Sequence, residues 1–290
     1  MNKAIYNRRS IRKYINKKIV FSIILIFAII WLIYTNMVVG VTSIKLSYAT
    51  LPSSFNGFKI VQVSDLHNAQ YGAGNKNLIK KIKKTQPDMI AITGDLIDSN
   101  STDIEVALSF VEEISKIAPC YYVTGNHEAW IGENTYLELE KGLQELGVRI
   151  LRDSEDIIEK NGDSILIIGM DDPDFAERNN GVARNMDPNE ISEISSHQFT
   201  VFLSHRPEYY ETYKKTDANL VLTGHAHGGQ FRLPFIGGVV APNQGFFPEY
   251  DSGVYREEEF VMVVSRGIGN SIIPVRVNNQ PEIVLIELRN

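Results

Sequence analysis

Five short apolar runs in this chain are each followed, within one to three residues, by a polar side chain that can bind a metal ion. The runs predict β-strands, and they cover residues 58–63, 88–92, 120–123, 200–203 and 220–222. The polar residues that follow them are, in order, Asp65, Asp95, Asn126, His205 and His225. Ligands of open α/β sheets gather outside the carboxyl ends of the strands. We therefore expect these five side chains to meet at one point in space.

The scarce histidines of the chain are concentrated at the same places. Five of the six fall in motifs, which are Asp65-Leu66-His67, Gly94-Asp95, Gly125-Asn126-His127-Glu128, His205 and Gly224-His225-Ala226-His227. Imidazole, carboxylate and amide oxygen are the ligands of divalent cations in hydrolytic sites. Taken singly, each motif is explained as well by a turn, a glycine-rich loop or a helix start. Together and in this order they favour a two-metal hydrolase.

The residue types suit hydrolysis of a phosphoester. Two cations about 3.5–4 Å apart neutralise the phosphate oxygens and lower the pKa of a bridging water. Such a site needs a carboxylate shared by both ions, and Asp95 is the natural candidate. His127 directly follows the neutral candidate ligand Asn126, and it is placed to protonate a leaving oxygen or to stabilise transition-state charge.

Charge is distributed unevenly along the 290 residues. The first 18 residues carry seven Lys or Arg and no acid, which leaves 22 basic against 35 acidic residues in the remainder. A body with a net charge of −13 lacks the basic footprint that nucleic-acid binding requires, so we expect no nucleic-acid partner. The single cysteine, Cys120, lies in an apolar run and cannot form an internal disulfide, so it leaves the redox compartment undetermined.

Residues 19–39 are almost wholly apolar. As a helix they span roughly 30 Å, the thickness of a bilayer core. The cations before this segment, against the lone Lys45 just after it, predict a cytoplasmic amino terminus and an extracytoplasmic domain. We therefore expect a basic cytoplasmic segment at 1–18 and a transmembrane signal anchor at 19–39, in a single-pass protein of the cell membrane.

Two other interpretations of this segment compete with an uncleaved anchor. A cleaved signal peptide has a shorter apolar region and a small-residue cleavage site, for which Val38-Val39-Gly40 is a weak match. A buried core helix is disfavoured by the cationic flank. Arg8-Arg9-Ser10-Ile11-Arg12-Lys13 is also loosely similar to a twin-arginine export signal. Cleavage of the anchor and the export route stay open.

The rest of the chain alternates strands with helices. Helical spacing of apolar residues predicts helices at 75–84, 103–117 and 135–146. Further strands are expected at 43–48, 148–151, 164–168, 260–264 and 283–288, and a long loop at 242–255. We expect a tether and first strand at 40–57, followed by one α/β domain at 58–290. Its architecture is predicted to be two packed sheets flanked by helices.

The motifs resemble those of the calcineurin-like metallophosphoesterase superfamily. The resemblance covers about residues 58–289 and includes Ser204-His205-Arg206 and Gly224 to Gln230. The carboxyl-terminal motifs are similar to those of the bacterial membrane-anchored cell-envelope branch, and they are Ser265 to Gly269, Pro274-Val275-Arg276 and Pro281-Glu282-Ile283.

This resemblance implies a fold and a site. The fold would be a four-layer α/β/β/α sandwich. One metal would be bound by Asp65, His67, Asp95 and His227. The other would be bound by Asp95, Asn126, His205 and His225, with Asp95 bridging. A metal-bridging hydroxide would attack the phosphorus, and His127 would assist the leaving group. Oxygen and nitrogen ligands without cysteine suit manganese, zinc or iron.

Two arginines are weaker candidates for binding the substrate phosphate. Arg206 follows a metal-ligand candidate and is equally explained as a surface arginine. Arg266, which lies between a strand and Gly267, is the weaker candidate of the two. An acidic turn at 171–174 and an aromatic loop at 246–250 carry no assigned role. The loop either rims the pocket, touches lipid or covers a sheet edge.

The leading interpretation is a membrane-anchored phosphoesterase. Its substrate, a small molecule or a lipid, would carry a phosphomonoester, a phosphodiester or a pyrophosphate. A non-catalytic metal-binding scaffold of the cell envelope is the alternative, and a metal-dependent nuclease is disfavoured by the acidic body. The sequence determines neither the substrate, nor the metals, nor the oligomeric state.

Overall fold

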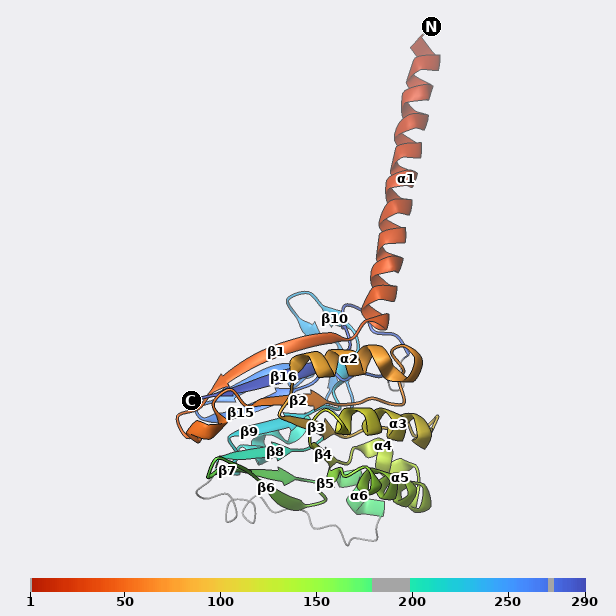
Figure 1. The fold of residues 1–290 in the computed structure, drawn as a ribbon. Coiled ribbons are helices and arrows are strands. Elements are labelled where there is room, and N and C mark those ends of the chain that lie inside the picture. Colours follow the sequence, from red (N-terminus) through yellow and green to blue (C-terminus); the bar gives the residue numbers. More distant parts are fainter. Residues whose placement is uncertain (1, 179–198, 271–273) are drawn as a thin grey trace.

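The computed structural model describes residues 2–178, 199–270 and 274–290. A long amino-terminal helix projects from an α/β body (Figure 1). His197, which the sequence places in a polar stretch outside the motifs, lies outside the described residues.

Two six-stranded mixed sheets form the body. In the first sheet the spatial order is β1 (Gly40–Ser47), β16 (Glu282–Arg289), β2 (Lys59–Val63), β3 (Met89–Thr93), β4 (Cys120–Val123) and β5 (Arg149–Ile150). In the second sheet it is β14 (Gly253–Glu257), β15 (Phe260–Val264), β9 (Leu220–Thr223), β8 (Thr200–Leu203), β7 (Asp163–Gly169) and β6 (Ser154–Lys160). Strands β2 to β5 are parallel to one another, as are β7, β8, β9 and β15.

Helices cover the outer faces of the sheets, with α2 (Lys76–Thr85), α3 (Ile104–Ser115) and α5 (Glu133–Glu145) on the first sheet and α8 (Tyr210–Tyr213) on the second. The other helices are α4 (Asn126–Trp130), α6 (Pro173–Arg178) and α1 (Asn2–Met37), which projects from the body. Two short hairpins follow β9, formed by β10 (Arg232–Leu233) with β11 (Gly237–Gly238) and by β12 (Val240–Ala241) with β13 (Gly245–Phe246).

Strand alternation builds three apolar layers. Successive side chains of a strand point to opposite faces, so Ile60 of β2 enters the core between the two sheets while Val61 faces α2 and α3. In the second sheet Ile167 of β7 enters the core between the sheets, and Leu166 faces the opposite side with Tyr210 and Tyr213. The expected four-layer α/β/β/α arrangement is therefore confirmed.

Most expected elements are found within a few residues of their predicted bounds. The first strand begins at Gly40 and pairs with β16 along its whole length. The expected loop at 242–255 instead contains β13 and the start of β14. The two-residue pairing of β13 with β12 is too short to leave a periodic pattern. Strand β6 was not expected, because it is an edge strand whose exposed face carries Glu155, Ile157 and Glu159.

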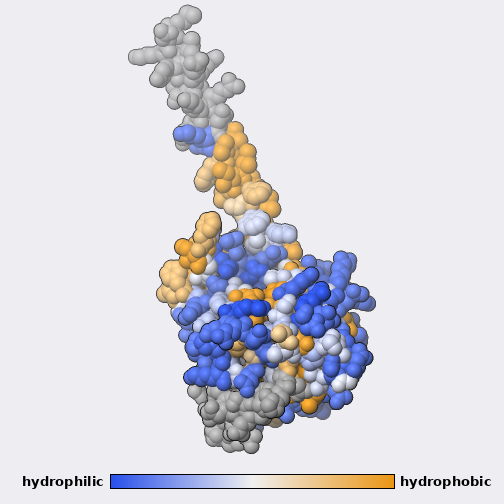
Figure 2. All heavy atoms as spheres, turned by 90° about the vertical axis from the view of Figure 1, so that its left-hand side faces the viewer, coloured by the Kyte–Doolittle hydropathy of each residue, from blue (hydrophilic) through white to orange (hydrophobic). Residues whose placement is uncertain are grey.

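The apolar segment of α1 is long enough to cross a membrane. The helix is continuous from Asn2, and its segment Lys17–Met37 is the candidate span, whose apolar residues are almost all exposed rather than buried in the protein. The helix ends two residues before the predicted end of the span at residue 39, and Val39 is already part of the core beneath α2. The space-filling view shows the apolar band of α1 standing clear of a mostly polar body (Figure 2).

Packing between the sheets can be tested with two isoleucines. Ile167 is fully buried between the sheets, whereas Ile157 on neighbouring β6 is 49% exposed. We expect Ile167→Ala to lower the free energy of unfolding by about 2–5 kcal/mol through lost burial and a cavity. Ile157→Ala should change it by less than about 1 kcal/mol. Urea unfolding of the two variants in the same detergent measures both, and equal effects would contradict face-to-face packing of the sheets.

Candidate metal centre

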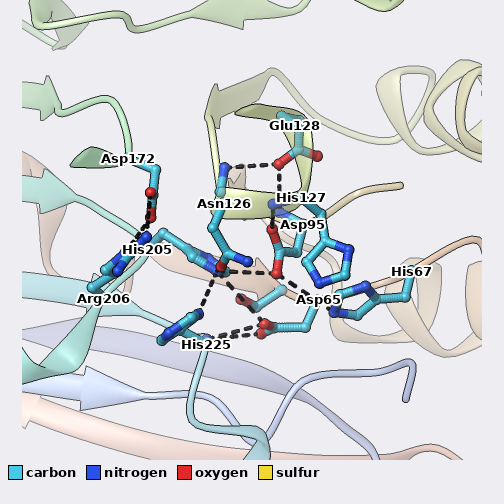
Figure 3. Close-up of polar contacts among 12 residues, drawn as sticks. Asp65, His67, Asp95, Asn126, His127, Glu128, Asp172, His205, Arg206 and His225 are labelled. Carbon is cyan, nitrogen blue, oxygen red and sulfur yellow. Dashed lines mark hydrogen bonds and ion pairs between the residues drawn. The ribbon is translucent and has the colours of Figure 1, made fainter. Parts of the chain in front are cut away.

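Five strand ends converge at one edge of the body. Asp65, Asp95 and Asn126 follow β2, β3 and β4 of the first sheet, and His205 and His225 follow β8 and β9 of the second. Their side chains point toward one another in the close-up (Figure 3). All seven candidate ligands are buried, with exposed fractions of 0–6%. The structure thus brings together the residues that the sequence singled out.

The turns that carry these side chains have unusual backbone geometry. Left-handed φ angles, which non-glycine residues seldom adopt, occur at Asp65 (52°), His67 (46°), Asp95 (50°), His225 (61°) and His227 (48°). Strain of this kind is kept where the surrounding structure enforces it, commonly at functional sites. Here it turns each side chain back over the end of its strand.

One group of polar atoms surrounds His205. Its Nε2 lies 3.2 Å from Oδ2 of Asp95, 3.2 Å from Oδ1 of Asn126 and 3.2 Å from Nδ1 of His225. These atoms come from four different loops, and Asp95, His205 and His225 form a cluster able to hold a metal ion.

A second group surrounds His67. Its Nε2 lies 3.2 Å from Nε2 of His227 and 3.5 Å from Oδ2 of Asp95, and Nε2 of His227 lies 3.6 Å from Oδ1 of Asp65. Asp65, His67 and His227 form one cluster, and His67, Asp95 and His127 form another. Asp95 is therefore shared between the two halves of the site.

These spacings fit metal coordination. Atoms bound to one ion at about 2.1 Å lie roughly 3 Å apart in tetrahedral or octahedral geometry. The Nε2 atoms of His67 and His227 lie 3.2 Å apart, close to this spacing. The donor set of imidazole, carboxylate and amide oxygen suits divalent cations.

The electrostatics keep three of the histidines neutral. Burial lowers the pKa of His67 to about 4, and burial also places the pKa values of His225 and His227 well below their usual range. Burial acts in the same direction on His205, but the nearby Asp95 carboxylate outweighs it and raises that pKa to about 10. A cation bound beside Asp95 has to displace the proton of His205.

Glu128 holds two of the ligand loops in place. Its carboxylate accepts hydrogen bonds from the backbone N–H groups of Asp95 (2.9 Å), Leu96 (2.7 Å), Ile97 (3.4 Å) and Gly125 (2.8 Å). No role for Glu128 was predicted from the sequence. Its spacing three residues after Gly125 is that of a capping box, which is the signal that could have found it.

His127 lies at the border of the site. Its backbone N–H donates to Oδ1 of Asp95 at 2.8 Å, and its Nδ1 accepts from the backbone N–H of Ser99 at 3.0 Å. Its ring packs edge-on against His67, with 4.4 Å between centroids. Because Nδ1 accepts a hydrogen bond, the proton of the neutral ring is on Nε2.

The two arginines suggested for substrate binding are both paired with acids. Nε and Nη2 of Arg206 each donate to Asp172 at 2.7 Å, and Asp174 lies 2.8 Å from Nη2. The acidic turn thus positions Arg206 beside the metal-ligand candidates (Figure 3). Nη2 of Arg266 contacts the buried carboxylate of Glu282. Substrate binding by Arg206 and Arg266 stays a prediction.

Arg276 is a further residue to which the sequence analysis gave no role. It is fully buried, and its Nη2 lies 3.3 Å from Nδ1 of His227. The carbonyl oxygens of Arg266 and Gly269 accept hydrogen bonds from its guanidinium. The sequence offered no signal for this contact, since the two residues are 49 positions apart.

Comparison with known proteins assigns the family. The model of the calcineurin-like phosphoesterase family matches residues 58–229. The chain is 30% identical over 253 residues to the uncharacterized metallophosphoesterase YkuE of Bacillus subtilis, covering 83% of this chain and 82% of that protein. It is 25% identical to the phosphodiesterase YaeI of Escherichia coli, covering 80% of this chain and 82% of that protein.

The name of a further relative combines a transmembrane protein with a metallophosphoesterase domain. The transmembrane protein with metallophosphoesterase domain of Danio rerio is 28% identical over 260 residues, covering 86% of this chain and 57% of that protein. The chain belongs to the calcineurin-like phosphoesterase family and is a hydrolase acting on phosphoric ester bonds.

The loops that carry Asp95 and Gly125 approach each other so closely that a methyl group added at Gly125 should disturb the site. A Cβ at Gly125 would lie 2.3 Å from Oδ1 of Asp95, whereas one at Gly40 meets its nearest atom at 3.5 Å. We expect Gly125→Ala to displace Asp95 and to weaken metal binding at least about ten-fold, with Gly40→Ala unchanged. Titration of the metal-stripped variants with Mn²⁺ or Zn²⁺ measures this, and equal affinities would contradict the geometry.

Proposed function

We propose that the chain is a membrane-anchored phosphoesterase that uses two divalent cations sharing the carboxylate of Asp95. The observation that supports it most strongly is the position of Oδ2 of Asp95, 3.5 Å from Nε2 of His67 and 3.2 Å from Nε2 of His205. Few structural roles require one buried carboxylate oxygen to face two histidines from different loops.

Two sets of residues would hold the cations. One set is Asp65, His67, Asp95 and His227, and the other is Asp95, Asn126, His205 and His225. Manganese, zinc or iron suit these ligands. When bound, such ions neutralise phosphate oxygens and lower the pKa of water enough to supply a nucleophile.

His127 would act on the leaving group. Its backbone is held by Asp95 and its ring by Ser99, so the ring is fixed with its Nε2–H free to hydrogen-bond the departing oxygen. That hydrogen bond would stabilise the negative charge that develops on the oxygen, and full proton transfer would require the ring to be in its imidazolium form. Asn126, as a neutral ligand, would orient the site without adding negative charge that repels the substrate.

The substrate class follows from the acidic body and the anchor. A phosphomonoester, phosphodiester or pyrophosphate on a small molecule or a lipid fits the site, and the net charge of −13 outside the first 18 residues disfavours a nucleic acid. Arg206 and Arg266 would contact the substrate phosphate with guanidinium groups not fully used by their acid partners.

The orientation in the membrane follows from the flanking charges. The basic segment 1–18 would stay in the cytoplasm and α1 would cross the bilayer as an uncleaved anchor, placing residues 58–290 outside the cytoplasm. The observed helix Lys17–Met37 supports the span itself. A non-catalytic metal-binding scaffold of the same fold is the competing function.

Hydrolysis by the full chain in detergent tests the proposal. The metal-stripped protein is given Mn²⁺ or Zn²⁺ and assayed on an aryl phosphodiester and an aryl phosphomonoester. We expect metal to restore turnover, and we expect His127→Ala to retain both metals while kcat falls about 10²- to 10⁴-fold. Asp95→Asn should lose both turnover and one or both metals.

The same assay includes a control variant and distinguishes the enzyme from a non-catalytic scaffold. Asp217 is an exposed aspartate, so Asp217→Asn is the matched substitution and should leave turnover unchanged. Stoichiometric metal binding without turnover on any phosphoester, including phospholipids and nucleotide-sugars, would favour the scaffold. Full activity of Asp95→Asn would refute the shared carboxylate.

A further inference from the structure

Helix α2 is strongly cationic although the chain around it is acidic. Five of its ten residues are lysines, it carries no acid, and it forms no ion pair within the described ranges. Its apolar side, with Leu78 and Ile82, packs on the first sheet. Unpaired lysines of one sign on a helix face are a footprint for an anionic partner.

A cleft lies between this helix and the end of α1. It has a volume of about 300 Å³ and is lined by Met37, Val38, Val39, Tyr71, Asn77, Leu78, Lys80, Lys81 and Lys84. The α1 side of the cleft is apolar and the α2 side carries the lysines. Met37 is the last residue of the candidate span, so a bilayer crossed by α1 would place its lipid headgroups at this cleft.

The end of α1 is firmly joined to the body. The Asn36 amide donates to the carbonyl oxygen of Arg276 at 2.8 Å, and its Oδ1 accepts from the Arg276 N–H at 2.8 Å. Gln280 donates to the carbonyl oxygen of Val38 at 2.8 Å, and Thr35 is only 4% exposed. A bilayer that surrounds α1 therefore meets a fixed face of the domain.

An apolar hairpin projects from the same face. The turn between β10 and β11 exposes Leu233 (45%), Phe235 (109%) and Ile236 (63%). Figure 1 shows this hairpin beside the base of α1, with α2 beneath that base, and Figure 2 shows an apolar patch rising from the polar body toward α1. Exposed apolar clusters with a polar rim mark interaction or membrane sites.

We propose that this face docks on an anionic bilayer. The cleft lysines Lys80, Lys81 and Lys84 bind the phosphate of an anionic phospholipid, and the tip 233–236 enters the acyl region of the same leaflet. A cationic patch next to a membrane span is attracted to anionic headgroups, and an aromatic and aliphatic tip gains by leaving water. The inference rests on α1 spanning a bilayer and is independent of the reaction at the metal centre.

The depth of the hairpin tip can be measured in the full-length chain. Phe235→Cys is labelled with an environment-sensitive fluorophore and reconstituted into nanodiscs that contain lipids with brominated acyl chains. The buried thiol of Cys120 does not compete, because burial raises its pKa to about 12. The matched control is Glu159→Cys on β6, which lies at the end of the body away from α1 (Figure 1).

Comparison of two lipid compositions tests separately whether the hairpin tip enters the bilayer and whether the α2 lysines bind anionic lipid. We expect the label at position 235 to be quenched several-fold more strongly than the control, and more strongly in an equal mixture of phosphatidylcholine and phosphatidylglycerol than in phosphatidylcholine alone. Absence of quenching in both compositions would overturn docking of the tip. Equal quenching in both would overturn the anionic-lipid site.

Charge reversal tests the lysines directly. Lys80→Glu with Lys84→Glu should reduce quenching to the level seen in phosphatidylcholine alone, while Lys141→Glu with Lys215→Glu, an equal change of charge at exposed positions outside α2, should not. Unchanged quenching in the α2 variant would refute the lysine site. Hydrolysis of a soluble aryl phosphodiester should stay unchanged in both, so failure here is distinguishable from failure of the proposed function.

Discussion

The carboxylate of Asp95 is the point on which both halves of the site depend. Its Oδ1 accepts the backbone N–H of His127, and its Oδ2 faces both His67 and His205. Its own backbone is strained into the left-handed region and held by Glu128, whose carboxylate joins the loops after β3 and β4. Burying so many polar groups costs free energy, and no single contact is strong enough to offset that cost. The packing of the two sheets beneath the site offsets it.

The arrangement of the two sheets explains how the candidate ligands come together. Their parallel strands end at one edge of the body, so that side chains from the first sheet and histidines from the second meet across the core between the sheets. Small residues make the approach close enough, as a Cβ at Gly224 would lie 2.4 Å from Oδ2 of Asp65. Two local patterns in the sequence indicate this edge, namely the apolar strands and the polar residues that follow them.

The sequence predicted the layers and the converging residues because both leave local patterns. Strand alternation and the motifs at strand ends are visible within a few residues of each other. The supporting contacts were not predicted, because they join distant positions. Arg276 beside His227 and Asp172 beside Arg206 depend on loop geometry that no local pattern encodes. The short hairpins after β9 were missed because two-residue strands carry no periodicity.

Electron paramagnetic resonance of the Mn²⁺-loaded chain shows whether two ions share a ligand. We expect two manganese ions per chain with an exchange-coupled spectrum, and loss of the coupling in Asp95→Asn. Manganese ions that remain magnetically isolated at full loading would contradict a pair of cations joined by Asp95.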